Sequence, residues 1–372
     1  MTLQTSSPHW HFPRPELAQA YLASFALGLS CARGLFARRR MGKTEFLVQD
    51  FIPAAEAKGY ACVYVNLWDL KDDPATALVS ALYKAIAPKG FAKAWERLKT
   101  PLKKIKASGK VAGVAEAGIE AELADKNRLA GTLLMDVMAA FDQTKIPLIL
   151  IIDEAQVLAD AENAVFAHAL RAALDIRKER IKVLFAGSSE ATLRRMFGRS
   201  SEPFYNWAAL EPFQLLGQEF VTAMVDKVAS IARTPLALAD ALAAFDALKQ
   251  TPLFFRLYLD RYLTNPFEGA QGALDFTKAH VFNDMGFEKQ WDELLPADQA
   301  LLAMIAAGTS DLQSGEARRR IGLRLGLEKP VTAATPQNAL RRLADKNIVT
   351  RMERGNYQFE DEAFADWVRH WE

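Results

Sequence analysis

The chain has 372 residues, of which 50% are hydrophobic, so it is long enough for a large core and for two or three domains. Its 46 Lys and Arg residues nearly balance its 45 Asp and Glu residues. The formal net charge of +1 excludes a strongly basic or acidic chain, so bulk charge predicts neither nucleic acid nor a membrane surface as a partner.

Three features predict a cytoplasmic protein with no membrane partner. His9-Trp10-His11 and Pro13 interrupt any apolar core of a signal peptide near the N-terminus. The most apolar run, residues 146–152, is far shorter than the roughly 20 residues that span a bilayer as a helix. Cys31 and Cys62 lie in apolar surroundings without metal-ligand spacing, which predicts buried, reduced thiols.

Strands and helices are predicted to alternate over the first half of the chain. Apolar or β-branched runs predict strands at 34–37, 60–65, 147–152 and 181–186. Apolar residues at helical spacing predict helices at 16–27, 44–51, 128–141 and 161–178. Asp73-Pro74 predicts a further helix, with Asp73 as its cap and Pro74 at its first position. This alternation predicts an α/β fold with a parallel sheet and crossover helices.

Residues 103–125 have a different composition from their surroundings. The segment is rich in Lys and then alternates small apolar residues with Glu around Gly113 and Gly118. It is interpreted as an exposed β-hairpin or a mobile insertion, or else as a solvated linker without a function.

Residues 37–44, Ala-Arg-Arg-Arg-Met-Gly-Lys-Thr, fit the phosphate-loop pattern G-x-x-x-x-G-K-[ST] except at the first position. The backbone N–H groups of such a loop bind phosphate oxygens at the start of a helix. Gly42 lets the backbone approach the phosphates, Lys43 reaches the β- and γ-phosphates, and the Thr44 hydroxyl ligates Mg²⁺. Ala37 tolerates an extended backbone but resists a positive φ. The loop therefore predicts a site for ATP and Mg²⁺, with a basic turn before a helix as the alternative.

A second motif follows the apolar run from Leu148 to Ile152. A parallel strand there carries Asp153 and Glu154 to the carboxyl edge of the sheet, beside the phosphate loop. We expect Asp153 to hold Mg²⁺ through water and Glu154 to polarise the attacking water. The alternative is that the two acids cap the next helix. The two motifs together predict nucleotide binding more strongly than either alone.

These motifs make the chain resemble the AAA+-related ATPases of the STAND and archaeal-type ATPase families. The resemblance is carried by residues 38–47 (Arg-Arg-Arg-Met-Gly-Lys-Thr-Glu-Phe-Leu), 151–156 (Ile-Ile-Asp-Glu-Ala-Gln) and 185–189 (Phe-Ala-Gly-Ser-Ser). The usual loop of these families, Gly-Pro-Arg-Arg-x-Gly-Lys-Thr, has Gly and Pro where this chain has Ala37 and Arg38. The resemblance implies a five-stranded P-loop core at 12–213, a helical lid at 214–265 and a C-terminal winged helix at 290–372.

The resemblance also implies roles for individual residues. Nucleotide contacts are expected from Ala37, Arg38, Arg39, Arg40, Met41, Gly42, Lys43, Thr44 and Glu45, and from Arg256 in the lid; Thr44 and Asp153 would serve the metal. Catalytic roles are expected for Lys43, Glu154 and Ser188. Ser188 or Ser189 would sense the γ-phosphate, although Gly-Ser-Ser is also a cap for a helix that starts at Glu190.

Two features of the resemblance are incomplete. In the lid, residues 250–252 (Gln-Thr-Pro) keep only the proline of the families' Gly-x-Pro. Arg194, Arg195 and Arg199 are candidates for an arginine finger offered to a neighbouring subunit. However, Asn206-Trp207 stands where relatives often have the arginine, so the finger is either one of these three or absent.

The C-terminal segment has the pattern of a winged helix. Helices are predicted at 296–307, 315–325 and 335–346, and strands at 348–352 and 357–359, with Thr335 as a cap and Pro336 at a first helical position. A DNA face within 315–357 would use Gln337, Asn338, Arg341 and Arg342, with Arg318, Arg319, Arg320 and Arg324. Residues 360–362 are acidic and would repel DNA, and winged helices also dock proteins, so a protein partner is the alternative.

The predicted function is an ATP-binding and ATP-hydrolysing switch, in which ATP closes the lid and hydrolysis reopens it. In one version, a DNA-associated ATPase forms a homo-oligomer on nucleic acid through its winged helix. In the other, a signalling or defence ATPase uses that module to hold a protein partner. Ala37 and the uncertain arginine finger leave a slow ATPase or pseudo-ATPase as a third alternative.

Overall fold

A computed structural model describes residues 10–70, 73–86, 131–232, 234–284, 287–309, 311–346, 348–353 and 356–371. The chain divides into two compact units, Met1–Ala37 with Lys43–Phe213 and Arg38–Gly42 with Gln214–Glu372. The predicted insertion at 103–125 and the start of the helix predicted at 128 lie outside the described residues. No described helix combines the length and the apolar character that crossing a membrane requires.

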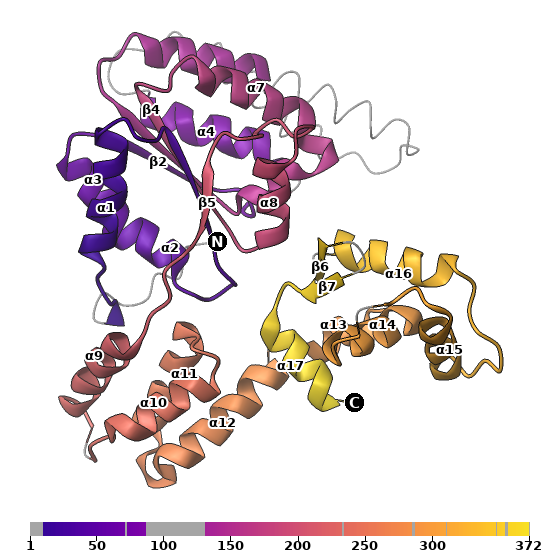
Figure 1. The fold of residues 1–372 in the computed structure, drawn as a ribbon. Coiled ribbons are helices and arrows are strands. Elements are labelled where there is room, and N and C mark those ends of the chain that lie inside the picture. The colour runs from indigo at the N-terminus through magenta and orange to yellow at the C-terminus, as the bar shows by residue number, and fades with distance from the viewer. Residues whose placement is uncertain are drawn as a thin grey trace. The chain divides into compact units, whose positions relative to one another are not determined.

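The first unit contains a parallel sheet whose described strands have the order β2-β3-β4-β1-β5 (Figure 1). The strands are β1 (Ala32–Phe36), β2 (Ala61–Asn66), β3 (Leu148–Asp153), β4 (Ile181–Gly187) and β5 (Ala209–Pro212). All pairs are parallel, with Phe36 opposite Gly187 and Asn66 opposite Asp153, so the carboxyl ends of the strands share one edge. This confirms the predicted parallel sheet and agrees with the five strands that the resemblance implies; β5 is the strand that no residue pattern had located.

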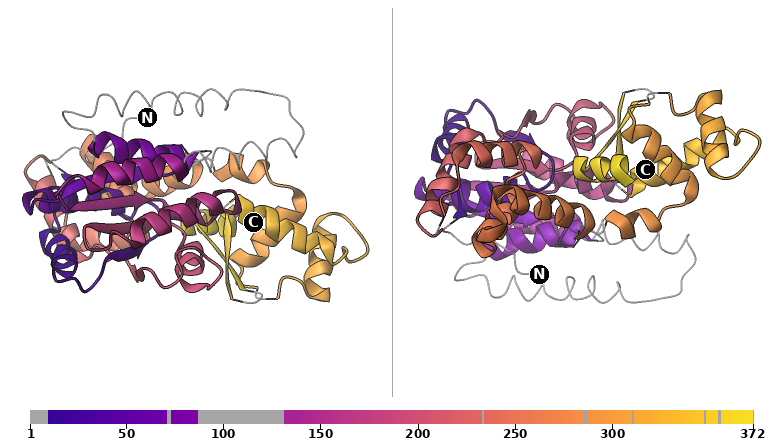
Figure 2. Two further views of the ribbon diagram at one scale, coloured as in Figure 1. Left: turned by 90° about the horizontal axis from the view of Figure 1, so that it is seen from above. Right: turned by 90° about the horizontal axis from the view of Figure 1, so that it is seen from below.

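Helices cover both faces of this sheet, as the two views in Figure 2 show. They are α1 (Pro15–Ala26), α2 (Lys43–Phe46), α3 (Ile52–Ala57), α4 (Pro74–Ile86), α7 (Ala164–Asp175) and α8 (Glu190–Gly198), and residues 131–142 are also helical. A π-helical turn, Leu47–Phe51, joins α2 to α3. Every residue of β3 and β4 is buried, which explains why both strands are mostly apolar, with Lys182 within β4 and Asp153 at the end of β3 as the charged exceptions.

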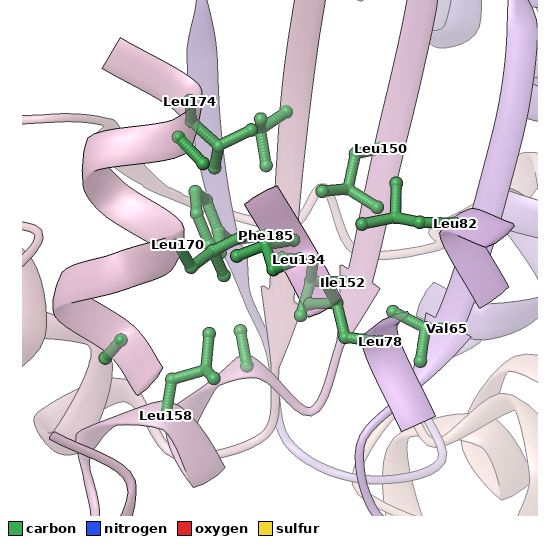
Figure 3. Packing of buried hydrophobic residues seen from close by; sticks show 14 of the residues in the cluster. Val65, Leu78, Leu82, Leu134, Leu150, Ile152, Leu158, Leu170, Leu174 and Phe185 are labelled. Carbon is green, nitrogen blue, oxygen red and sulfur yellow. The ribbon is translucent and has the colours of Figure 1, made fainter. Parts of the chain in front are cut away.

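The core on one face of the sheet is formed by alternate strand residues and by helical leucines (Figure 3). Leu150 and Ile152, two residues apart on β3, point to this face together with Phe185 of β4. Leu78 and Leu82 of α4 and Leu170 and Leu174 of α7 pack against them. The apolar spacing of the helices thus buries one stripe of each, as predicted.

The second unit begins with four helices: α9 (Gln218–Ala229), α10 (Leu238–Ala247), α11 (Pro252–Thr264) and α12 (Gly269–Asp284). The rings of Phe220, Phe245, Phe255 and Tyr258 contact one another in the core of the first three. The sequence predicts helices up to about residue 264, whereas α12 is an addition that the structure reveals.

The remainder of the second unit contains the helices and the strand pair that were predicted to form a winged helix. The helices are α13 (Phe287–Asp292), α14 (Pro296–Ala306), α15 (Gly315–Arg324), α16 (Ala334–Asp345) and α17 (Glu362–Trp371), and β6 (Val349–Glu353) pairs antiparallel with β7 (Asn356–Phe359). These elements share a hydrophobic core of their own. The α14–α15–α16–β6–β7 order is the predicted one, and α17 is an addition.

The start of α16 differs from the prediction. The helix begins at Ala334, and its N-cap residue Ala333 offers no capping side chain. Thr335 is therefore not the cap, and its hydroxyl lies 3.2 Å from the hydroxyl of Thr332 instead. Pro336 falls within the first turn, where its missing N–H has no helical acceptor to lose.

Candidate nucleotide-binding site

The loop between β1 and α2 contains two residues with a left-handed backbone, one of which is a glycine. Its positive φ angles fall on Arg40, at 68°, and Gly42, at 82°, whereas Ala37 is not among the described residues with a positive φ. The substitution of Ala for Gly at the first position therefore causes no backbone strain. The buried ammonium of Lys43 donates a hydrogen bond to the Ala37 carbonyl at 2.6 Å. A buried ammonium group needs such an acceptor, and phosphate oxygens would provide stronger ones.

Thr44 and Asp153 meet at the carboxyl edge of the sheet. The Thr44 hydroxyl donates to Asp153 Oδ2 at 2.7 Å, and the Tyr64 phenol donates to the same oxygen at 2.9 Å. The pKa of the fully buried Asp153 is raised by burial and by the charge of Glu154, against hydrogen bonds from Thr44 and Tyr64 and the charge of Lys43. A hydroxyl and a carboxylate are oxygen ligands of the kind that Mg²⁺ prefers, so these residues fit that ion.

Tyr64 has no role in the sequence-based prediction. It lies on β2 opposite Ile151, two residues before the Asn66–Asp153 pair. Burial and the Asp153 carboxylate raise the pKa of the phenol, which therefore stays protonated and remains a donor. A tyrosine near the end of a strand that adjoins β3 is the one feature of the sequence that could have indicated this contact.

Glu154 and Ser188 also meet, together with Gln156. Glu154 has a left-handed backbone, with φ 53° and ψ 43°, and its Oε2 accepts hydrogen bonds from Ser188 Oγ at 2.8 Å and Gln156 Nε2 at 2.5 Å. Within the described part of the chain neither acid caps a helix through its side chain: Glu154 makes no capping hydrogen bond, and Asp153 Oδ1 accepts from the adjacent Glu154 N–H at 3.0 Å.

The structure shows one of the two roles predicted for the Gly-Ser-Ser motif. Ser189 caps α8, since its hydroxyl accepts from the Thr192 N–H at 3.3 Å. Ser188 donates to Glu154 instead, and its sensing of the γ-phosphate stays a prediction.

Other predicted site residues have different surroundings. Glu45 Oε1 lies 3.0 Å from Nδ1 of His11, whose Nε2 lies 2.8 Å from Asp50 Oδ1. His11 thus bridges two carboxylates of the α2 region, a contact that the sequence did not predict. Arg256 lies on α11, in the second unit. Its contact with nucleotide stays a prediction, as do the contacts of residues 38–41.

The candidate finger arginines make local contacts. Arg194 Nε donates to Glu190 Oε1 at 2.7 Å, and an Arg195 Nη donates to the Ala159 carbonyl at 3.0 Å. Arg199 is exposed. The cysteines are free thiols, but only half-buried rather than fully buried as predicted. Burial raises the pKa of Cys62 to about 12, so its thiol stays protonated near neutral pH.

The fold has counterparts among solved structures. No protein-family model matches the sequence, and neither does any curated protein. A Walker-type ATPase of Pyrococcus abyssi superposes with a TM-score of 0.60 at 16% identity, covering 96% of each chain. The ORC2 protein of Aeropyrum pernix, solved with ADPNP and ADP, gives 0.54 at 16% identity, over 96% of this chain and 93% of that one. The ORC1 protein of the same organism, solved in complex with DNA, gives 0.50 at 14% identity, over 97% and 93%.

The chain therefore shares its overall fold with this Walker-type ATPase and these ORC proteins, which confirms the predicted α/β fold class. At these identities the likeness concerns the fold alone.

Proposed function

We propose that the first unit binds ATP with Mg²⁺ and hydrolyses the bond to its γ-phosphate. The observation that carries the proposal is the meeting of two motifs at one sheet edge: Thr44 contacts Asp153, and Ser188 contacts Glu154. Lys43 lies next to Thr44, and its ammonium is held at the end of β1. Phosphate-binding, metal-binding and water-activating groups are thus contributed by the ends of β1, β3 and β4.

Each residue has a distinct task in this proposal. Lys43 exchanges the Ala37 carbonyl for β- and γ-phosphate oxygens, and the backbone of residues 37–45 surrounds the phosphates. Thr44 and Asp153 hold Mg²⁺, which neutralises phosphate charge when bound. Glu154 orients a water molecule and accepts its proton as the water oxygen bonds to the γ-phosphorus and the bond to the ADP oxygen breaks. The Ser188 hydroxyl, which donates its one hydrogen to Glu154 Oε2 in the structure, exchanges that acceptor for a γ-phosphate oxygen when ATP binds.

Lys43→Ala tests the binding half of this proposal. The change removes the side-chain charge aimed at the phosphates, so a folded variant should lose measurable affinity for a fluorescent ATP analogue. Lys58→Ala, at the end of α3, is the matched control and should bind as the parent does. Equal affinity in Lys43→Ala and the parent would reject the loop as the nucleotide site.

Glu154→Gln tests the hydrolytic half. The amide keeps the shape of the side chain but cannot accept the proton, so hydrolysis should fall by about 100-fold or more while ATP binding persists. Phosphate release under single-turnover conditions is the measurement. Equal rates in the variant and the parent would remove Glu154 from the mechanism, and a parent that binds but never hydrolyses ATP would be a pseudo-ATPase.

We infer that the second unit carries the output of an ATP-driven switch and contacts DNA through the winged helix. Gln337, Asn338 and Arg341 are exposed on α16, which supports a DNA face, as does the similar fold of the ORC1 protein solved with DNA. Arg319, Arg320 and Arg324 are exposed on α15 and add positive charge. The alternative is that the same face of the winged helix binds a protein partner. If the face binds DNA, the chain would form a homo-oligomer on the nucleic acid.

Arg342 was predicted to contact DNA, but in the structure it pairs with an acidic residue of the same unit. Its guanidinium donates to both carboxylate oxygens of buried Asp298, at 3.1 and 2.5 Å. Arg341, its exposed neighbour, is therefore the arginine of α16 that the proposal assigns to DNA. Binding of labelled duplex DNA should weaken steeply with added salt; binding that is absent at low salt would favour the protein partner.

A further inference from the structure

We propose that Gln156 is a positioning residue that holds Glu154 and Ser188 in one arrangement, an inference that rests on the proposed hydrolysis of ATP. Gln156 has no catalytic task of its own. It lies in the 3₁₀ turn Ala155–Ala159 that follows β3, and only 7% of its surface is exposed.

The amide of Gln156 connects two strand ends. Its Nε2 donates to Glu154 Oε2 at 2.5 Å and to Ser188 Oγ at 3.2 Å. Ser188 Oγ donates to the same Glu154 oxygen at 2.8 Å, which closes a ring of three side chains. Because an amide NH₂ group carries two hydrogens, Gln156 can donate to both partners at once.

This arrangement leaves Oε1 of Glu154 available to accept a proton from water. Both side-chain donors bind Oε2, and no described residue donates to Oε1. A long carboxylate side chain on a left-handed backbone has several rotamers, and two hydrogen bonds to one oxygen select among them. Oε1 is then directed as the acceptor for the proton of a water molecule.

Gly187, the last residue of β4, provides the space for Gln156. A Cβ atom at this position would lie 2.2 Å from Gln156 Oε1 and 3.4 Å from its Cδ. The backbone φ of Gly187 is not positive, so the glycine is needed for room rather than for an unusual conformation. The motif Gly187-Ser188 thus admits Gln156 and presents its hydrogen-bond partner in two successive residues.

The cost of burying Gln156 supports a role for its amide. Its Oε1 is buried and has no hydrogen-bond partner among the described residues. A buried acceptor without a partner destabilises the fold, and an apolar side chain of the same length would avoid that cost. Such a replacement would lose the two hydrogen bonds that the amide NH₂ group donates to Glu154 and Ser188.

Gln156→Met is the first test, because Met has similar length and no donor. Single-turnover hydrolysis should fall by about 10-fold or more, with affinity for a fluorescent ATP analogue within about 2-fold of the parent. Gln271→Met is the matched control, since exposed Gln271 likewise donates to a carboxylate, Asp275, at 2.9 Å. If Gln156→Met does not fold, Gln156→Asn keeps the amide but is one methylene too short, and should show the same loss.

A double-mutant cycle separates positioning from a merely structural role. If Gln156 acts through Glu154, Gln156→Met should slow the parent but leave the residual rate of Glu154→Gln unchanged. A structural role would lower both rates by the same factor. Gly187→Ala, whose Cβ would lie 2.2 Å from Gln156 Oε1 and 3.0 Å from Leu193 Cδ1, should also slow hydrolysis in the parent.

The outcomes distinguish a failure of the positioning role of Gln156 from a failure of the proposed hydrolysis of ATP. Equal rates for Gln156→Met and a hydrolysing parent, or equal losses in both backgrounds of the cycle, would overturn the positioning role alone. A parent that does not hydrolyse ATP would overturn the proposed function, and this inference with it.

Discussion

At the scale of single residues, Asp153 depends on donors from two other elements. Thr44 and Tyr64 both donate to its Oδ2, and both hydrogen bonds counteract the rise in its pKa that burial causes. If Thr44 held Mg²⁺ as proposed, Tyr64 would be the remaining side-chain donor to this carboxylate among the described residues. Outer partners of this kind orient a metal ligand without touching the ion.

Tyr64→Phe should therefore weaken the use of Mg²⁺ rather than the binding of nucleotide. The Mg²⁺ concentration for half-maximal hydrolysis should rise about 10-fold, the lower end of the usual effect of an outer partner. Affinity for the ATP analogue without metal should stay unchanged. Tyr60→Phe, just before β2, serves as the control, and an unchanged Mg²⁺ requirement in Tyr64→Phe would contradict the role given to its phenol.

At the scale of the element, α16 has one exposed and one paired arginine in succession. Arg341 is exposed, whereas Arg342 donates hydrogen bonds to Asp298 of α14. Only 1% of the surface of Asp298 is exposed. The hydrogen bonds that Arg342 donates to Asp298 raise the pKa of Arg342, so its guanidinium stays charged. The two arginines thus offer a matched comparison between stability and DNA contact.

Arg342→Ala should lower the stability of the winged helix by about 2 kcal/mol, because it leaves the Asp298 carboxylate buried and unpaired. The expected cost is below that of a fully buried pair, since the Arg342 side chain is 36% exposed. Arg341→Ala should leave the unfolding temperature unchanged and weaken DNA binding, with a smaller dependence on salt. Thermal unfolding and DNA titration of both variants are the measurements, and identical behaviour of the two would contradict the assignment.

The elements also indicate how far the sequence predicts this protein. β3 and β4 could be predicted because both faces of each strand are buried, so their residues are apolar except for Lys182 within β4 and Asp153 at the end of β3. A fifth strand was implied by the resemblance alone, and β5 could not be located from its own residues, since these four are exposed or half-buried and have no apolar pattern. The start of α16 was misplaced because Ala333 leaves no capping side chain to recognise.

The site was predictable to the same limited degree. Lys43, Thr44, Asp153 and Glu154 belong to contiguous motifs with known spacing. The contacts of Tyr64 and Gln156 depend on strand register and on the turn after β3, which bring together residues far apart in the chain. Neither can be obtained from local pattern or propensity.

At the scale of the whole molecule, the proposed switch requires nucleotide in the first unit to affect the second. A ligand shifts a conformational equilibrium only through contacts that differ between the two states. Lys43 of the first unit and Arg256 of α11 are the residues proposed to provide them. The corner between α11 and α12 offers a place to detect the effect, because Phe267 there is 84% exposed and is a site for chymotrypsin.

The same corner is held closed by Arg261. Its Nε donates to Glu268 Oε2 at 2.8 Å, and its guanidinium carbon lies 3.7 Å from the centroid of the Phe276 ring. Cleavage at Phe267 needs this corner to open locally, so the cleavage rate reports the stability of the α11–α12 connection.

We expect magnesium and a slowly hydrolysed ATP analogue to change the rate of chymotrypsin cleavage at Phe267. Lys43→Ala, which cannot bind nucleotide, should show no change. Arg256→Ala should bind the analogue nearly as the parent does but show a weaker change, because it lacks the contact that distinguishes the two states. Digestion patterns that are the same for the parent with and without the analogue would mean that nucleotide does not reach the second unit, and the chain would then be an ATPase without the proposed switch.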